Sequence, residues 1–105
     1  MGKPDTRRLD KAIQQTNRKL DAVRNREMWP LDGHERRAVL AALASGSYRI
    51  TRGNSTARAD RKLNTAWQSA ETRLTAEITA LQIERQRVVT EAARDKSVKR
   101  LMGWW

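Results

Sequence analysis

Apolar residues in the first quarter of the chain recur with the spacing of a helix. Successive members of this stripe stand three or four positions apart: Leu9, Ile13, Thr16, Leu20 and Val23. Such spacing places them on one narrow face of an α-helix, as in a coiled coil. The pattern ends before Pro30, because proline disfavours helical geometry in the residue that precedes it. We therefore expect a first helix at about residues 5–28 and a break at Trp29–Pro30.

A second, shorter helix is expected at about residues 32–45. Asp32 and Glu35 stand three positions apart, as in a capping box in which Asp replaces Ser or Thr. Its apolar face is predicted to consist of Val39, Leu40 and Leu43. The pair Ser45–Gly46 is a normal helix stop, so residues 46–54, with two Gly and one Ser, are predicted to form a basic loop.

The third helix is the dominant feature of the pattern, at about residues 55–101. No Gly or Pro interrupts the chain between Ser55 and Met102. Forty-odd helical residues would extend about 60–70 Å at 1.5 Å per residue. Arg85 is the one charged residue on the predicted stripe, whose other members are Leu63, Trp67, Ala70, Leu74, Ile78, Leu81, Val88 and Ala92.

These three segments predict an all-α protein with a single helical domain, residues 1–105. The first two helices laid end to end would match the third in length. We therefore expect an antiparallel helical hairpin or coiled coil, with one long C-terminal helix and a first arm broken at Trp29–Pro30. A compact three-helix bundle is the alternative, if the chain reverses at Pro30. With nine Leu, four Ile, five Val and no Phe, the core is small, and packing against a second copy in a homodimer is expected.

The charge of the chain indicates that the predicted hairpin is a binding protein. The formal net charge is +10, and 16 of the 22 basic residues are Arg. Such an excess attracts polyanions, and the planar guanidinium fork suits contacts with phosphate. A GC-rich genome would also favour Arg over Lys, but it would not explain the net charge. Nucleic acid, an anionic membrane surface and an acidic protein are the candidate partners.

The excess is concentrated in residues 36–62, where seven basic residues face one acidic residue, Asp60. We predict that this region forms a phosphate-binding tip for DNA or RNA, with low sequence specificity. A solvated basic turn is the structural alternative, and a helix-turn-helix with its turn at Ser45–Ser47 is a less favoured one, since the following segment contains Gly53. The predicted nucleic-acid-binding residues are Arg36, Arg37, Tyr48, Arg49, Arg52, Arg58, Arg61 and Lys62.

The tail at residues 102–105 suggests a second function class. It ends in two indoles beside cationic residues, and the predicted partner-binding set is Lys99, Arg100, Trp104 and Trp105. Such a tail could dock in a groove of another protein or cover an exposed end of the helical domain. The alternative function is therefore an adaptor or assembly protein, of phage or mobile-element origin among other contexts, that binds an acidic protein through its long helix and this tail.

Signals for catalysis are missing from the sequence. The chain has no Cys, and its one histidine, His34, is expected at the surface. No glycine motif for nucleotide phosphates occurs. We therefore predict no enzymatic activity, no cofactor and no metal site. No apolar run approaches the length of a membrane span or of a signal peptide, so a cytoplasmic location is expected.

Overall fold

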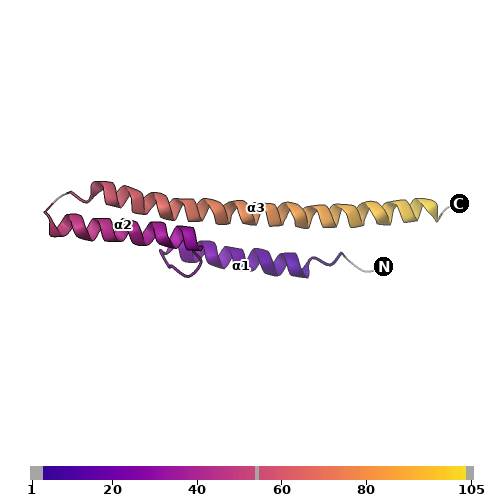
Figure 1. Ribbon diagram of the computed structural model, residues 1–105. Helices are drawn as coiled ribbons and strands as arrows, with labels where there is room; N and C mark the ends of the chain where they lie inside the picture. The colour runs from indigo at the N-terminus through magenta and orange to yellow at the C-terminus, as the bar shows by residue number, and fades with distance from the viewer. Residues whose placement is uncertain (1–3, 54, 104–105) are drawn as a thin grey trace.

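The chain folds into three α-helices arranged as a long hairpin (Figure 1). The computed structural model describes residues 4–53 and 55–103, and within this range all side chains except those of residues 49–51. Helix α1 spans Arg7–Arg24, α2 spans Gly33–Thr51 and α3 spans Ala57–Met102. α1 and α2 follow one another along one side of α3 and run antiparallel to it. The predicted hairpin with a first arm broken at Trp29–Pro30 is thus confirmed.

The hairpin is an extended rod and not a compact bundle. Its principal extents are 83 × 18 × 18 Å, and its radius of gyration is 22.1 Å. A compact chain of this length would have a radius of gyration of about 13 Å. Contacts join α1 to α3 and α2 to α3, while α1 and α2 share no more than the junction between them. The alternative of a compact three-helix bundle is therefore wrong.

The break between α1 and α2 is built by a hydrogen-bonded helix end. The N–H of Arg26 donates to the carbonyl of Val23, and the N–H of Glu27 donates to that of Ala22. This is the pairing of a Schellman motif, in which the residue after the cap adopts a left-handed conformation. Arg26 occupies that position with a φ of 62°, and its guanidinium lies 5.5 Å from the centre of the Trp67 ring. The helix end is thereby fastened to α3.

A thin core runs between α3 and the two shorter helices. From α3 it receives Trp67, Ala70, Leu74 and Ile78, four of the residues predicted for the apolar stripe. From the other arm it receives Leu20, Val23, Leu31 and Val39. Leu81 and Val88, further along the stripe, are only half-buried, because two helices alone cannot enclose a side chain on all sides. The stripe itself was predicted correctly.

The predicted loop at residues 46–54 is wrong, because α2 continues to Thr51. The connection between α2 and α3 is residues 52–56. Gly46 stays helical where α2 lies against α3: a Cβ placed on Gly46 would come 3.6 Å from the Cβ of Ala59. Contact with α3 therefore outweighs the low helix propensity of glycine. Since residues 45–47 lie inside a continuous helix, the helix-turn-helix layout is absent as well.

The predicted apolar face of α2 is correct only in part. Val39 is 1% exposed, but Leu40 and Leu43 are 52% and 48% exposed. Val39 and Ala42 face α3 together with the buried Glu35, and this orientation turns the two leucines towards solvent. Trp29 also differs from expectation, since it is 56% exposed instead of packing at the break. Among the helices of the described residues, none is long and apolar enough to cross a membrane.

Candidate nucleic-acid interface

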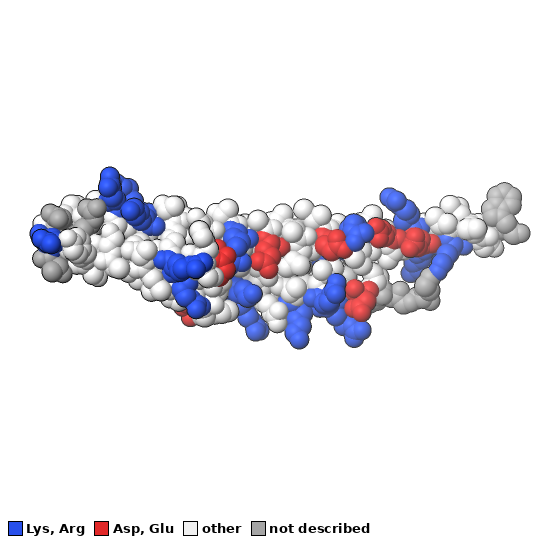
Figure 2. Space-filling model, in the orientation of Figure 1, with Lys and Arg blue, Asp and Glu red and all other residues white. Residues whose placement is uncertain are grey.

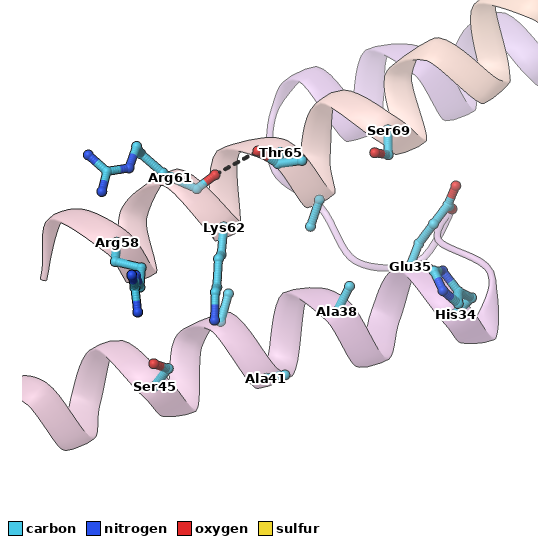
Figure 3. Close-up of a pocket in the computed structure, with 12 residues that line it drawn as sticks. His34, Glu35, Ala38, Ala41, Ser45, Arg58, Arg61, Lys62, Thr65 and Ser69 are labelled. Carbon is cyan, nitrogen blue, oxygen red and sulfur yellow. Dashed lines mark hydrogen bonds between the residues drawn. The ribbon is translucent and has the colours of Figure 1, made fainter.

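A groove runs between α2 and the first turns of α3, close to the end of the hairpin (Figure 3). Its volume is about 530 Å³. The two helices lie close together here, since alanines Ala42, Ala59 and Ala66 are the buried residues at their contact. Small side chains at the contact leave an open channel along one flank of the helix pair. The residues that line it are His34, Glu35, Ala38, Ala41, Ala42, Ser45, Arg58, Arg61, Lys62, Thr65, Ala66 and Ser69.

The two walls of the groove differ in chemistry. α3 supplies the three cations Arg58, Arg61 and Lys62, followed by hydroxyl side chains. α2 supplies His34 and Glu35 at the junction end of the groove, where Glu35 is paired with Arg73, and then Ala38, Ala41 and Ser45, which carry no charge and are called the neutral wall. In Figure 3, Arg58 and Lys62 extend towards α2, whereas Arg61 points away from it. The groove thus has a cationic wall, a neutral wall and a floor of alanine.

Ion pairing separates the shaft of the hairpin from its end. In the shaft (α1 and residues 71–92 of α3), four arginines are matched with carboxylates: Arg24 with Glu71, Arg73 with Glu35, Arg85 with Asp10, and Arg87 with Glu84 and Glu91. In the basic tip (residues 48–62) the described cations have no ion-pair partner among the described residues: Arg52, Arg58, Arg61 and Lys62. On the face shown in Figure 2, acidic and basic side chains lie side by side along α3 of the shaft, basic ones predominate along α1, and the tip end shows basic side chains alone.

Electrostatics in the shaft follow from these pairs. The pKa of the Asp10 carboxyl is lowered, chiefly by the hydrogen bond from Arg85 and then by that from the Thr6 hydroxyl. The pKa of Glu84 is lowered by its hydrogen bonds with Arg87. Arg85, the one charged residue on the apolar stripe of α3, is thus explained by its partner on α1. The shaft thus contains matched charges on α3, whereas the described cations of the tip are not matched.

An aromatic residue continues the neutral wall towards the tip. Ala41, Ser45, Tyr48 and Arg52 follow one another at spacings of four, three and four residues, which places them along one flank of α2 and its C-terminal end. Tyr48 is 59% exposed, and the Arg52 guanidinium lies 5.4 Å from the centre of its ring. This stacked pair is solvent-accessible. It stands where the groove opens at the end of the hairpin.

The N-terminus of α3 is occupied by its own side chains. The Thr56 hydroxyl donates to Asp60 over 3.2 Å, and the N–H of Ala57 donates to the Ser55 hydroxyl over 3.2 Å. Free N–H groups and the helix dipole at a helix N-terminus generally favour anions. A carboxylate already stands in the first turn. The unpaired cations of the groove are therefore the better place for a phosphate.

The structure brings together only part of the predicted nucleic-acid-binding set. Arg58, Arg61 and Lys62 share the groove, and the Tyr48–Arg52 pair lies at its end. Arg36 and Arg37 are exposed in the first turns of α2 and do not line the groove, and they lie at the opposite end of this helix from the Tyr48–Arg52 pair. Arg49 belongs to α2, but its side chain lies outside the described residues.

The predicted partner-binding set is described only in part. Lys99 and Arg100 are exposed in the last turn of α3, at the opposite end of the hairpin from the groove. Trp104 and Trp105 lie outside the described residues. The two predicted sites are therefore far apart on the rod, and each can be changed without touching the other.

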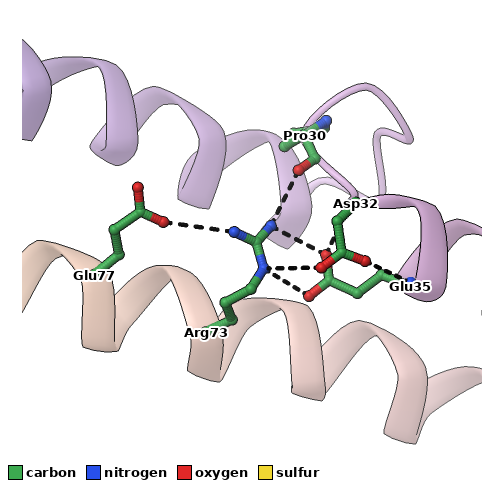
Figure 4. Close-up of polar contacts among 5 residues, drawn as sticks. All are labelled: Pro30, Asp32, Glu35, Arg73 and Glu77. Atoms are coloured by element: carbon green, nitrogen blue, oxygen red, sulfur yellow. Dashed lines mark hydrogen bonds and ion pairs between the residues drawn. The ribbon is translucent and has the colours of Figure 1, made fainter.

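A polar cluster at the junction of the helices escaped the sequence analysis (Figure 4). The Arg73 guanidinium donates to both carboxylate oxygens of Glu35 over 2.7 and 3.0 Å, and to the carbonyl of Pro30 over 3.2 Å. Glu35 also accepts the N–H of Asp32 over 3.0 Å, while its own N–H donates to Asp32 over 2.8 Å. The hydrogen bond to Glu35 is the main cause of a raised pKa at Arg73. The predicted capping box is present, but its partner Arg73 is 38 residues from Glu35 and left no local signal.

The groove residues His34, Ser45, Thr65 and Ser69 were also not predicted as part of a site. Their helical spacing was visible in the sequence, but which flank of α2 would line a channel depends on the contact with α3. Within the described residues, no group of three or more His, Asp or Glu side chains is placed to hold a metal ion. Comparison with known proteins finds no matching family, no matching curated protein and no matching solved structure.

Proposed function

We propose that this chain is a small nucleic-acid-binding accessory protein that grips phosphates with the groove and the basic tip. The observation that carries the proposal is the cluster of unpaired cations Arg52, Arg58, Arg61 and Lys62 at one end of a protein in which Arg24, Arg73, Arg85 and Arg87 of the shaft are paired. Unpaired cations on one surface attract a polyanion without first breaking ion pairs of their own. The rest of the fold holds this surface at one end of a rigid rod.

Phosphate is the group that this surface fits best. Arg binds phosphate through two parallel N–H donors, and Lys binds it as a point charge. The cationic wall lies on one helix, with Arg58 and Arg61 a turn apart and Lys62 beside them. Such contacts position a nucleic-acid backbone but do not read base edges. Low sequence specificity follows from this chemistry.

Fluorescence anisotropy with labelled DNA and RNA at several salt concentrations tests the proposal. The variant Arg58→Ala, Arg61→Ala, Lys62→Ala removes the cationic wall. The matched control Lys11→Ala, Arg18→Ala, Arg94→Ala removes two Arg and one Lys that are also exposed and without an ion pair among the described residues. Both variants lower the net charge by the same amount. A difference in their affinities therefore reports contacts in the groove and not the overall attraction of a positive protein for a polyanion.

The wild type and the control should bind alike, and the groove variant should bind more weakly. Because each neutralised phosphate contributes a slope of about −0.9, the salt dependence of the groove variant should become shallower by about 2–3. Equal weakening in both variants would show that binding follows net charge alone. If the wild type binds none of the nucleic acids near physiological salt, the proposal is contradicted.

A second candidate function, an adaptor for an acidic protein, is favoured by the far end of α3. α3 continues past the start of α1 (Figure 1), and residues 93–102 are all exposed. This overhang carries three apolar side chains, Val98, Leu101 and Met102, which are 46%, 67% and 68% exposed. Together with the cations Lys99 and Arg100 they form an amphipathic helix end. Such an end suits the groove of an acidic partner.

Truncation distinguishes this candidate from the first. A chain that stops after Gly103 should keep its helix content by circular dichroism, because the helices and their core lie before this point. If the adaptor function holds, the truncated chain and Leu101→Ser should both lose a partner that is cross-linked to the wild type in cells, while the groove variant keeps it. Retention of the partner by both tail variants would rule out this docking surface.

A further inference from the structure

We infer that the groove and the Tyr48–Arg52 pair select single-stranded nucleic acid, with Tyr48 as a stacking platform for an unpaired base. This inference rests on the proposed function and names its substrate class. Two features carry it: the walls of the groove differ in charge, and an exposed aromatic ring stands at the end of the uncharged wall.

A single strand has the same asymmetry as the groove. Its phosphates lie along one edge and its bases along the other. The α3 wall, with Arg58, Arg61 and Lys62, is complementary to the phosphate edge. The α2 wall and floor, with Ala38, Ala41 and Ala42, present small uncharged surfaces to the bases. Duplex ends aside, a double helix would present phosphates to both walls and keep its bases inside, so the neutral wall would have no partner.

The aromatic ring gives the base edge a specific contact. Tyr48 is 59% exposed at the end of α2, although Tyr is a residue that usually buries its ring at least in part. Arg52 lies over the ring at 5.4 Å from its centre, and both groups offer flat surfaces on which bases stack. Non-specific single-strand proteins combine such rings with a positively charged groove, and each stacked base contributes about 1–3 kcal/mol.

The groove also has the size of a short single-strand site. Arg58 and Ser69, near the two ends of its α3 wall, are eleven positions apart in the helix. At 1.5 Å per residue they are separated by about 16 Å. Stacked nucleotides at about 3.4 Å each would place roughly five in this length. Such a strand would leave the groove at the tip, where Tyr48 and Arg52 stand.

Three labelled probes of one length test the inference: a base-bearing single strand, the same strand in a duplex, and a phosphodiester strand of abasic residues. The proteins are the wild type, Tyr48→Leu and Tyr48→Phe. Leu keeps an apolar side chain but cannot stack, while Phe keeps the ring and lacks only the hydroxyl. Since Tyr48 is mainly exposed, neither change should alter the folding, which circular dichroism checks.

The wild type should bind the base-bearing strand at least about 5-fold more tightly than the abasic strand, as one stacked base implies. Tyr48→Leu should lose this difference, with unchanged affinity for the abasic strand, and Tyr48→Phe should keep it. Three outcomes would overturn the inference while leaving phosphate binding intact. The wild type could bind the base-bearing and abasic strands equally, it could prefer the duplex, or Tyr48→Leu could bind the base-bearing strand as tightly as the wild type does. Polyglutamate, added at the same concentration of negative charge as the strand, serves as a competitor. If it displaces the strand, the inference is wrong and an acidic peptide is the better ligand.

If none of the three probes binds, the proposed function is wrong as well. Loss of base selectivity alone can therefore be distinguished from loss of nucleic-acid binding altogether.

Discussion

Arg73 joins α3 to α2 and to the connection between α1 and α2 through one guanidinium group. It comes from α3, pairs with Glu35 of α2 and donates to the Pro30 carbonyl in the segment that follows α1. The Glu35 side chain is 8% exposed, and its ion-pair partner is Arg73. The capping box of Asp32 and Glu35 could be predicted from their three-residue spacing. Arg73 could not, because its contacts depend on how the helices pack.

Replacing Arg73 by Met should destabilise the hairpin by about 2 kcal/mol. Removing one partner of a buried ion pair costs about 3–5 kcal/mol, and partial exposure of the Arg73 side chain lowers this value. The control is Arg87→Met, since Arg87 pairs with two carboxylates of its own helix and its side chain is 56% exposed. Urea unfolding should show a clear loss of stability for the first variant and little change for the second. Equal effects would contradict a special role of the junction.

Asp10 makes the stability of the shaft depend on pH. Because Arg85 and Thr6 lower its pKa in the folded state, the ionised carboxylate stabilises folding above its ordinary pKa of 3.8. This contribution is lost as the pH falls below 3.8 and through the lower pKa of the folded state. Asp10→Asn should therefore melt at a lower temperature than the wild type at neutral pH, and the difference should shrink in acid. A difference in melting temperature that persists unchanged in strong acid would contradict the assignment.

At the scale of whole elements, the two helices with long periodic patterns, α1 and α3, were predicted correctly, whereas the end of the shorter α2 was not. α1 and α3 each carry a stripe of apolar residues over several turns, so their existence and partners follow from spacing. α2 has a weaker pattern, since Ala42 and the helical Gly46 contribute to its contact with α3 as much as Val39 does. Local propensity therefore placed its end at Gly46, and packing extended it to Thr51. The groove depends on this extension and was missed with it.

The two glycines on either side of the α2 end should respond oppositely to alanine. Gly46→Ala should stabilise the protein by about 0.5–1 kcal/mol, because alanine has the higher helix propensity and its Cβ would meet only the Ala59 side chain at an ordinary contact distance of 3.6 Å. Gly53→Ala should destabilise it, because Gly53 has a φ of 73°. Thermal unfolding of the two variants measures both signs. A destabilising Gly46→Ala would indicate that α2 ends at Gly46 after all.

The molecule as a whole exposes more surface than its mass requires. Its solvent-accessible surface is 8217 Å², whereas a compact monomer of 12.1 kDa exposes about 6,000 Å². The excess of about 2,000 Å² is comparable with the area that a stable interface buries. The homodimer expected from the small core stays a prediction, and sedimentation equilibrium at several protein concentrations tests it. A monomer throughout the micromolar range would remove this expectation without affecting the groove.

The contrast between a shaft with matched charges on α3 and a basic tip without matched charges is the central claim at this scale. Backbone amide shifts of the ¹⁵N-labelled protein, recorded during titration with a single-stranded oligonucleotide, test it most directly. The account predicts shifts at Ser45 and Tyr48 on α2, at Arg52 just after it and at residues 57–69 of α3, with little change in α1 and at residues 78–92. Shifts that are spread along α1, or concentrated at the C-terminal end of α3, would contradict it.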